Sequence, residues 1–212
     1  MSAPHNPYVG AYPELPERAG VWHEIARYVQ RDLPQVRTLV ELGAGYCDFS
    51  KAFPAQRKIA FDLNPEMKRF AGPDVDLRID DAVELSGIEA GSVDLVFASN
   101  FLEHLPPDRI EALLRRVNEV LSERGRLALL QPNHRLCADH YFDDPTHCTA
   151  LDDASMAELL RGCGLRVVRV VPGLLPFSMK SRLPKWPLLV RLYLHSPVRP
   201  LAAQMYLLAE RG

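Results

Sequence analysis

Residues 40–50, "VELGAGYCDFS", contain the turn that decides the fold. An apolar run ends at Glu41, and two glycines follow at Gly43 and Gly45. Glycine adopts positive φ without strain and lets the backbone approach a ligand closely. In open parallel sheets, ligands bind at the carboxyl ends of the strands, where the first strand–helix turn lies. The stretch therefore predicts a strand, a ligand-binding glycine turn and a helix.

Apolar runs and helical patterns alternate around this turn. We expect strands at residues 37–42, 58–63, 75–79, 92–99, 125–132, 165–171 and 203–210, and helices at 47–54, 64–72, 107–125 and 152–164. Strands separated by helices form a parallel sheet that is covered on both faces. A proline-rich excursion separates the last two strands. The expected fold is α/β, a doubly wound Rossmann-like sheet, mostly parallel with an antiparallel final strand.

Composition indicates one soluble domain. The chain has 212 residues, of which 47% are hydrophobic and 25% charged, as in ordinary globular proteins. Its four cysteines include no C-x-x-C pair, so free thiols in a reducing cytoplasm are expected. The proline-containing start, residues 1–20, has no basic segment followed by an apolar core and is predicted to be an arm, not a signal peptide. We therefore expect a cytoplasmic protein.

The charges are distributed unevenly along the chain. The formal net charge is −2, yet residues 159–209 contain eight Lys or Arg and no Asp or Glu. One interpretation is a solvated face without further meaning. The other is a basic surface for an anionic acceptor or for peripheral membrane contact.

The glycine turn disfavours a dinucleotide. The dinucleotide fingerprint G-x-G-x-x-G places its third glycine beside the pyrophosphate. Counted from Gly43, that position is Asp48. A carboxylate there would repel the pyrophosphate, so hydride transfer with NAD is not expected.

The turn instead resembles motif I of the class I S-adenosylmethionine-dependent methyltransferases, E/D-x-G-x-G-x-G. Glu41, Gly43 and Gly45 match it, and Cys47 stands at the last glycine position. This departure is tolerable if Cys47 needs no positive φ. S-adenosylmethionine carries a sulfonium and an ammonium but no phosphate, so acidic residues suit its pocket.

The resemblance implies a cofactor site at the ends of four strands. Asp62 closes the second predicted strand about twenty residues after the turn, the separation that a ribose contact requires. Asp81 matches the acid that meets the adenine amine, and Asn100 and His104 match the segment along the methionine part. The implied cofactor-binding residues are Glu41, Gly43, Ala44, Gly45, Asp62, Leu63, Asp81, Ala82, Asn100 and His104.

Residues 131–153, "QPNHRLCADHYFDDPTHCTALDD", are where this family usually places acceptor-facing side chains. Three interpretations of this stretch stay open. A histidine base for a hydroxyl acceptor is the first, with His147 preferred because it lies just before a predicted helix, and His140 second. A metal site from His140, Asp143, Asp144 and His147 is another, although we expect no metal. In the third, these residues cap turns and helix ends.

The last forty residues are similar to the ends of bacterial methyltransferases of polysaccharide and glycoconjugate synthesis. The shared pattern is an "LP…KSRLP" run, an "LVRLYL" helix and a closing strand. It would imply a sugar hydroxyl as acceptor, with phosphates neutralised by Lys180, Arg182 and Lys185. Whether or not the tail binds phosphates, a set of apolar residues is expected to pack as a lid over the sheet: Leu188, Leu189, Leu192 and Tyr193.

Together these patterns predict a single methyltransferase domain over residues 1–212. Its parts are the N-terminal arm, a cofactor-binding core at 36–131, and an acceptor-side loop with a basic elaboration at 132–212. The expected reaction is O-methylation of a glycan or small-molecule acceptor. Methylation of a small secondary metabolite and a non-catalytic cofactor-binding module are the alternatives. Nucleic acid is not expected as a partner, because no basic stripe with interleaved aromatics lies near the cofactor motifs.

Overall fold

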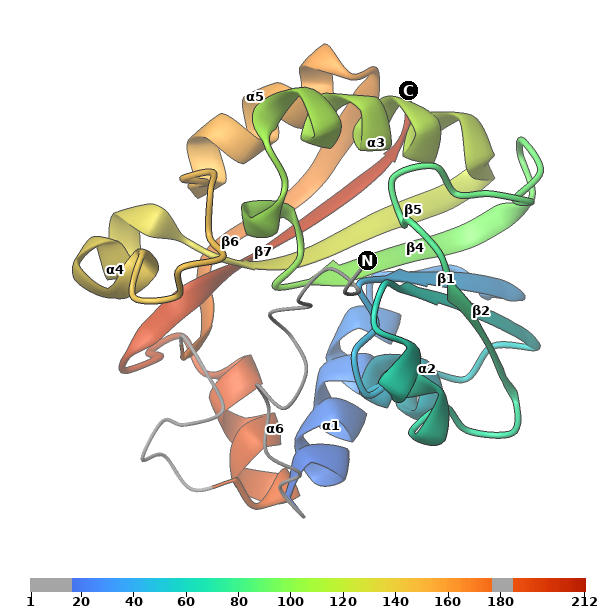
Figure 1. Cartoon of the computed structure of the whole chain (residues 1–212). Helices are drawn as coiled ribbons and strands as arrows, with labels where there is room; N and C mark the ends of the chain where they lie inside the picture. The colour runs from blue at the N-terminus through green and yellow to red at the C-terminus, as the bar shows by residue number, and fades with distance from the viewer. Residues whose placement is uncertain (1–16, 177–184) are drawn as a thin grey trace, which may run out of the picture.

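A seven-stranded sheet with helices on both faces forms the computed structural model, which describes residues 17–176 and 185–212 (Figure 1). The strands are β1 (Thr38–Leu42), β2 (Arg57–Asp62), β3 (Val75–Ile79), β4 (Val93–Ser99), β5 (Leu121–Pro132), β6 (Leu165–Pro176) and β7 (Ala202–Arg211). The α-helices are α1 (Arg18–Gln30), α2 (Asp48–Ala52), α3 (Pro107–Val120), α4 (His134–Tyr141), α5 (Asp153–Gly162) and α6 (Pro187–His195). Two short 3₁₀ helices are η1 (Pro65–Arg69) and η2 (Leu102–His104).

The strand order is β3-β2-β1-β4-β5-β7-β6. Strand β1 pairs in parallel with both β2 and β4, whereas β7 is antiparallel to β5 and β6. The predicted doubly wound sheet with an antiparallel final strand is confirmed. The order reverses between β1 and β4, so their carboxyl ends border the crevice where ligands bind in such sheets.

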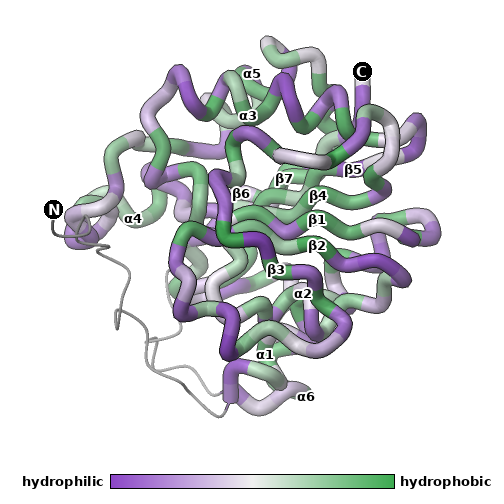
Figure 2. The backbone as a smooth tube through the Cα atoms, turned by 45° about the vertical axis from the view of Figure 1, so that its right-hand side comes forward, coloured by the Kyte–Doolittle hydropathy of each residue, from purple (hydrophilic) through white to green (hydrophobic). Residues whose placement is uncertain are grey.

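Each face of the sheet has its own apolar core. Helices α3 and α5 cover one face, and α1, α2 and α6 cover the other (Figure 1). Along β1, Val40 packs in the core beneath α3, and its neighbour Leu39 packs in the core that includes α1. The central strands are therefore apolar on both sides, and their residues are mostly hydrophobic in Figure 2, which explains why they read as nearly continuous apolar runs.

Helix α1 is the main element that the sequence analysis did not predict. It begins at Arg18, within the expected arm at residues 1–20; residues 1–16 lie outside the described part. Its buried residues include Glu24, whose carboxylate accepts hydrogen bonds of 2.9 and 3.0 Å from Arg191 of α6. The Glu24 carboxylate of α1 is thus buried together with Arg191, a residue far along the sequence that compensates its charge.

The predicted end of the third helix at Gly125 is wrong. Helix α3 ends at Val120, and Leu121 already pairs with Val93 in the sheet. Gly125 lies inside β5, where an added Cβ would approach the carbonyl oxygen of Val93 to 2.7 Å. This glycine therefore permits close strand contact at a register shift of the β4–β5 ladder and does not terminate a helix.

Helix α6 is present where the resemblance implied it, but the expected lid packing is wrong for three leucines. Its buried residues are Val190 and Leu194. Leu188 and Leu192 expose 63% and 58% of their surface, and Leu189 exposes 37%. The helix packs mainly against α1, with only Tyr193 of the expected set partly buried in that core.

All four cysteines are free thiols, with Cys148 exposed and the other three buried. No helix among the residues that the structure describes is both long and apolar enough to cross a membrane.

Candidate functional site

The glycine turn between β1 and α2 leaves an open face for a ligand. Gly43 and Gly45 have φ of +61° and +50°. A Cβ on Gly43 would lie 2.5 Å from Cδ2 of Phe101, so this position admits no side chain. A Cβ on Gly45 would meet no atom within 4 Å. Close packing at Gly43 and open space at Gly45 fit a turn whose backbone approaches a bound molecule.

Cys47 corrects one expectation. Its φ is +54°, in the left-handed region, so the condition under which the departure from glycine would be tolerable is not met. This conformation costs a residue with a Cβ about 1–2 kcal/mol. The Cys47 side chain is fully buried and packs with Ala44 and Ala60, which offsets the strain.

Asp62 connects the end of β2 to the turn. One carboxylate oxygen accepts a hydrogen bond of 2.7 Å from the Gly45 amide, and the other accepts one of 2.8 Å from the Asn64 amide. Burial raises its pKa, and these two bonds oppose that change. Each carboxylate oxygen can accept a second donor, so Asp62 has capacity for ribose hydroxyls. Leu63 beside it is 61% exposed, an apolar neighbour for a bound base.

Glu41 holds α2 against β1. Its carboxylate accepts a 3.0 Å hydrogen bond from the Ser50 amide and a second one from the Ser50 hydroxyl. Both residues are buried, and burial raises the pKa of Glu41 to about 7. The structure therefore gives this predicted cofactor residue a partner within the protein. Ala44 has one as well, since its amide donates to the Phe61 carbonyl at 3.0 Å.

Asp81 pairs with a residue that the sequence analysis did not identify. Arg109 of α3 donates a hydrogen bond to one of its carboxylate oxygens, and the Val83 amide donates to the other at 3.0 Å. Ala82, which lies between Asp81 and Val83 in the sequence, is buried. Arg109 thus fixes the loop after β3, the place assigned to the adenine.

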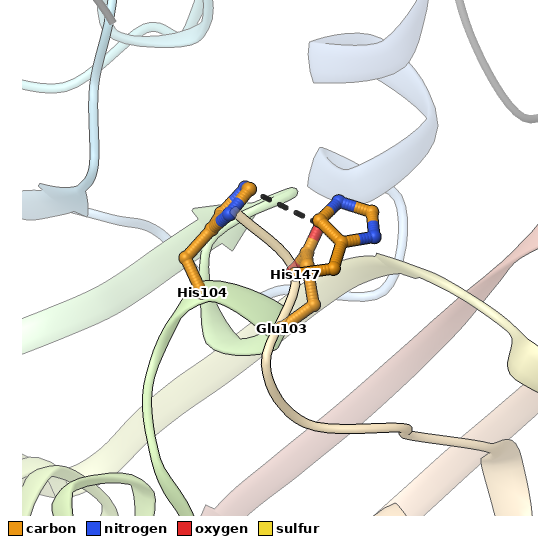
Figure 3. A group of neighbouring side chains, drawn as sticks. All are labelled: Glu103, His104 and His147. Atoms are coloured by element: carbon orange, nitrogen blue, oxygen red, sulfur yellow. Dashed lines mark ion pairs between the residues drawn. The ribbon is translucent and has the colours of Figure 1, made fainter. Parts of the chain in front are cut away.

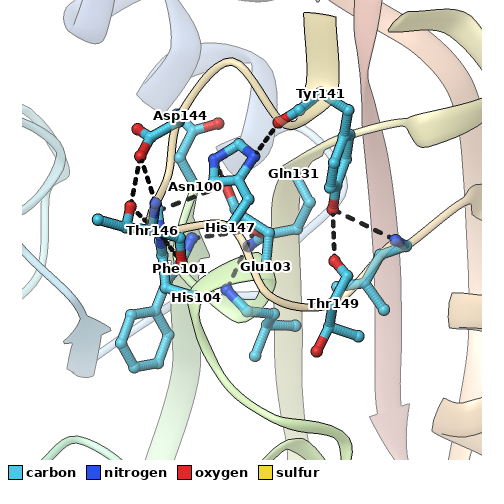
Figure 4. Close-up of polar contacts among 12 residues, drawn as sticks. Asn100, Phe101, Glu103, His104, Gln131, Tyr141, Asp144, Thr146, His147 and Thr149 are labelled. Carbon is cyan, nitrogen blue, oxygen red and sulfur yellow. Dashed lines mark hydrogen bonds and ion pairs between the residues drawn. The ribbon is translucent and has the colours of Figure 1, made fainter. Parts of the chain in front are cut away.

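The loop after β4 is held by two glutamines. The Gln131 side chain of β5 is buried and accepts hydrogen bonds from the Phe101 and Leu102 amides, at 3.0 and 3.3 Å (Figure 4). Gln204 of β7 donates to the Asn100 side chain at 2.8 Å. Their role has no local sequence signal, because it depends on strands that meet only in the folded sheet.

A buried cluster follows this loop: Glu103, His104 and His147, called here the Glu–His–His cluster (Figure 3). Glu103 is fully buried, and no hydrogen-bond donor among the described residues reaches either of its carboxylate oxygens. Its Oε1 lies 4.0 Å from Nε2 of His104 and 3.9 Å from Nε2 of His147. Burial raises the pKa of Glu103 to about 8 and lowers that of His104.

The acceptor-side loop completes this cluster. The Tyr141 carbonyl hydrogen-bonds Nδ1 of His147 (Figure 4). A carbonyl only accepts, so Nδ1 carries a proton, and Nε2 is the ring nitrogen on the side of Glu103. The Thr146 hydroxyl lies 2.9 Å from Nδ1 of His104. The Cys148 amide donates to the Glu103 carbonyl at 2.9 Å, which ties the loop to the end of β4.

His140 lies apart from the cluster. Its side chain is 73% exposed, and its Nδ1 is 3.0 Å from Asp143, which is 71% exposed. Asp144 accepts a hydrogen bond from the Thr146 amide at 2.9 Å. Among the described residues, the group close enough to hold a metal is the Glu–His–His cluster, so the loop set of His140, Asp143, Asp144 and His147 is not gathered. Of the basic residues expected at the phosphates, Lys180 and Arg182 lie outside the described residues.

We expect Glu41→Gln to change how stability depends on pH. The raised pKa means that folded Glu41 keeps a proton which the unfolded chain has lost between pH 4.5 and about 7. Its contribution is complete below pH 4.5 and falls by up to about 3 kcal/mol as the pH rises through 7. Chemical denaturation from pH 4 to 8 should show this loss in the wild type and not in the variant, whose amide oxygen still accepts from Ser50. Parallel curves would contradict the assignment.

Comparison with known proteins agrees with this geometry. The methyltransferase domain family matches residues 40–129. No curated protein matches the sequence. Similar folds occur in S-adenosylmethionine-dependent methyltransferases from Archaeoglobus fulgidus (TM-score 0.67, 19% identity, 91% of this chain and 93% of that chain covered) and Clostridium acetobutylicum (0.64, 14%, 97% and 95%). One from Mesorhizobium loti is also similar (0.62, 16%, 88% and 96%). The matched domain contains the glycine turn and the ends of β1 to β4, and the chain is similar in fold to S-adenosylmethionine-dependent methyltransferases.

Proposed function

We propose that this chain is an S-adenosylmethionine-dependent methyltransferase and that it methylates a hydroxyl oxygen of a sugar-containing acceptor. The observation that carries this proposal is the position of His147, a residue of the acceptor-side loop, beside the buried Glu103 at the end of β4. A hydroxyl acceptor must lose a proton, and a histidine next to a carboxylate is suited to assist that loss.

The cofactor supplies an activated methyl group on its sulfonium. With S-adenosylmethionine bound, the acceptor oxygen would form a bond to the methyl carbon as the carbon–sulfur bond breaks, and the electron pair would stay on sulfur. The protein aligns the reactants and excludes water. We assign the departing hydroxyl proton to the Glu–His–His cluster.

Asp62 is the residue we assign to the ribose hydroxyls. Its two carboxylate oxygens are oriented by the Gly45 and Asn64 amides, so the side chain is positioned before the ligand arrives. The open space beside Gly45 supports this assignment, because the Gly45 amide donates the hydrogen bond that holds the Asp62 carboxylate.

Asp62→Ala should weaken binding of S-adenosylhomocysteine by about 10–100-fold, since charge-assisted hydrogen bonds contribute about 1.5–3 kcal/mol each. Calorimetric titration measures this directly, with NAD as a ligand expected not to bind. Asp76→Ala, which removes an exposed carboxylate of β3, is the matched control. Unchanged affinity in Asp62→Ala would remove the residue from the ribose site.

His147→Ala should lower turnover by about 10²–10⁴-fold, the usual range for loss of general acid–base assistance, while affinity for S-adenosylhomocysteine stays nearly constant. Transfer of a tritiated methyl group to sugar acceptors provides the measurement. His140→Ala is the matched control, because its exposed ring lies outside the cluster. If the two variants lose equal activity, the assignment of His147 fails.

We extend the proposal to an acceptor that is presented at a membrane surface. Residues 159–209 are free of acidic side chains. Around α6, several apolar side chains are exposed: Trp186 (72%), Leu188 (63%), Leu192 (58%), Val198 (73%) and Leu201 (69%). Exposed apolar groups beside basic residues are typical of helices that lie in the interface of anionic bilayers.

The double variant Leu188→Ser/Leu192→Ser should bind anionic vesicles at least about tenfold more weakly, since each buried leucine contributes about 1.5–3 kcal/mol. Co-sedimentation with phosphatidylglycerol vesicles measures the change, and Trp186 fluorescence reports insertion. Val168→Ser removes an exposed apolar side chain of β6 and should bind like the wild type. Failure of the wild-type protein to bind would refute membrane contact.

A further inference from the structure

The Glu103 carboxylate lacks the partners that a buried charge requires. It is fully buried, and neither oxygen receives a hydrogen bond from the described residues. Other buried acids of this protein are satisfied: Glu24 pairs with Arg191, and Glu41 accepts from Ser50. Buried carboxylates are normally paired, hydrogen-bonded or bound to a cation. The environment of Glu103 therefore points to a partner that is not a protein side chain.

Two imidazole nitrogens face the same carboxylate oxygen. Nε2 of His104 and Nε2 of His147 lie 4.0 and 3.9 Å from Oε1 of Glu103. These distances exceed a hydrogen bond. A metal ion with bonds of about 2.0–2.2 Å separates tetrahedral ligand atoms by about 3.4 Å. An ion between these groups thus requires the Glu103 oxygen and each ring nitrogen to approach by about half an ångström, in a set of ligand atoms that all lie within 4.8 Å of one another.

The opposite sides of both rings are already oriented. Nδ1 of His147 donates to the Tyr141 carbonyl, and Nδ1 of His104 lies 2.9 Å from the Thr146 hydroxyl, which in turn hydrogen-bonds Asp144. Metal-binding histidines usually have their second nitrogen fixed in this way, which sets the tautomer and the ring direction. The loop therefore fixes both rings as metal ligands are fixed, and the Asn100 backbone is a further hydrogen-bond partner of His104.

We propose that Glu103, His104 and His147 bind one divalent transition-metal ion, with Zn²⁺ as the best fit. Two imidazoles and one carboxylate suit Zn²⁺ better than Mg²⁺, which prefers oxygen ligands. Three protein ligands leave one position open. The side chains of His104 and His147 are 10% and 6% exposed, so the cluster reaches the surface at one edge.

The role of the ion in methyl transfer rests on the proposed function, whereas its binding does not. An acceptor hydroxyl at the open position would lose its proton more readily, because a bound cation stabilises the oxyanion. His147 would then assist proton loss through the ion and not by taking the proton itself.

Zinc binding can be measured without any acceptor. Protein freed of metal with a chelator and then dialysed should take up one Zn²⁺ per chain in calorimetry and unfold at a higher temperature with Zn²⁺, while Mg²⁺ has little effect. Glu103→Gln and His147→Ala should each lower Zn²⁺ affinity by more than the roughly 10–100-fold typical of losing an outer partner. His195→Gln, at an exposed histidine of α6, is the matched control and should bind like the wild type.

Binding of S-adenosylhomocysteine by each variant verifies that it is folded. Zinc uptake that is absent in the wild type, or equal in wild type and Glu103→Gln, would overturn the proposal and leave Glu103 as a protonated acid. Full methyl transfer by chelator-treated protein would refute the role of the ion but preserve the O-methyltransferase. One bound zinc without transfer to any hydroxyl acceptor would support the site and refute the proposed function.

Discussion

The site depends on the backbone of the turn after β1, in which alternate residues Gly43, Gly45 and Cys47 all have positive φ. This conformation directs the Gly45 amide at Asp62, which fixes the carboxylate at the end of β2. It also brings Gly43 against the Phe101 ring, so the loop after β4 has a fixed position relative to the turn. The ends of β1, β2 and β4 are thereby set with respect to one another before any ligand binds. The proposed cofactor site depends on this backbone geometry as much as on side-chain chemistry.

Much of the fold could be predicted, because its signals are local. Continuous apolar runs identify strands covered on both faces, and an acid at the end of a strand, such as Asp62, can be located by counting from the glycine turn. The missing parts depend on long-range contacts. Helix α1 buries Glu24, which reads as a surface residue until Arg191 neutralises it. Gly125 looks like the end of a helix, and only the approach of β4 shows its role in the sheet.

The candidate site likewise has one part that the sequence predicts and another that depends on long-range contacts. His147 could be singled out from composition and position, but its partner Glu103 could not, because the two residues meet only when the loop after β5 folds back over the end of β4. The Cys148 and Thr149 amides both donate to the Glu103 carbonyl, so the backbone fixes this return. The same contacts place the acceptor-side loop beside the segment assigned to the methionine part of the cofactor. The residues that we assign to the cofactor and to the acceptor therefore belong to one connected structure.

The position of β7 between β5 and β6 has a consequence for synthesis on the ribosome. This strand follows every other strand in the chain, yet it fills the centre of one half of the sheet. Until it emerges, β5 has an unpaired edge, and β6 has no neighbour in the sheet. Unpaired edges of apolar strands attract other chains. The nascent domain is therefore most exposed to aggregation in the interval after β5 and β6 have left the ribosome and before β7 has emerged, when β1 to β4 are already able to pair.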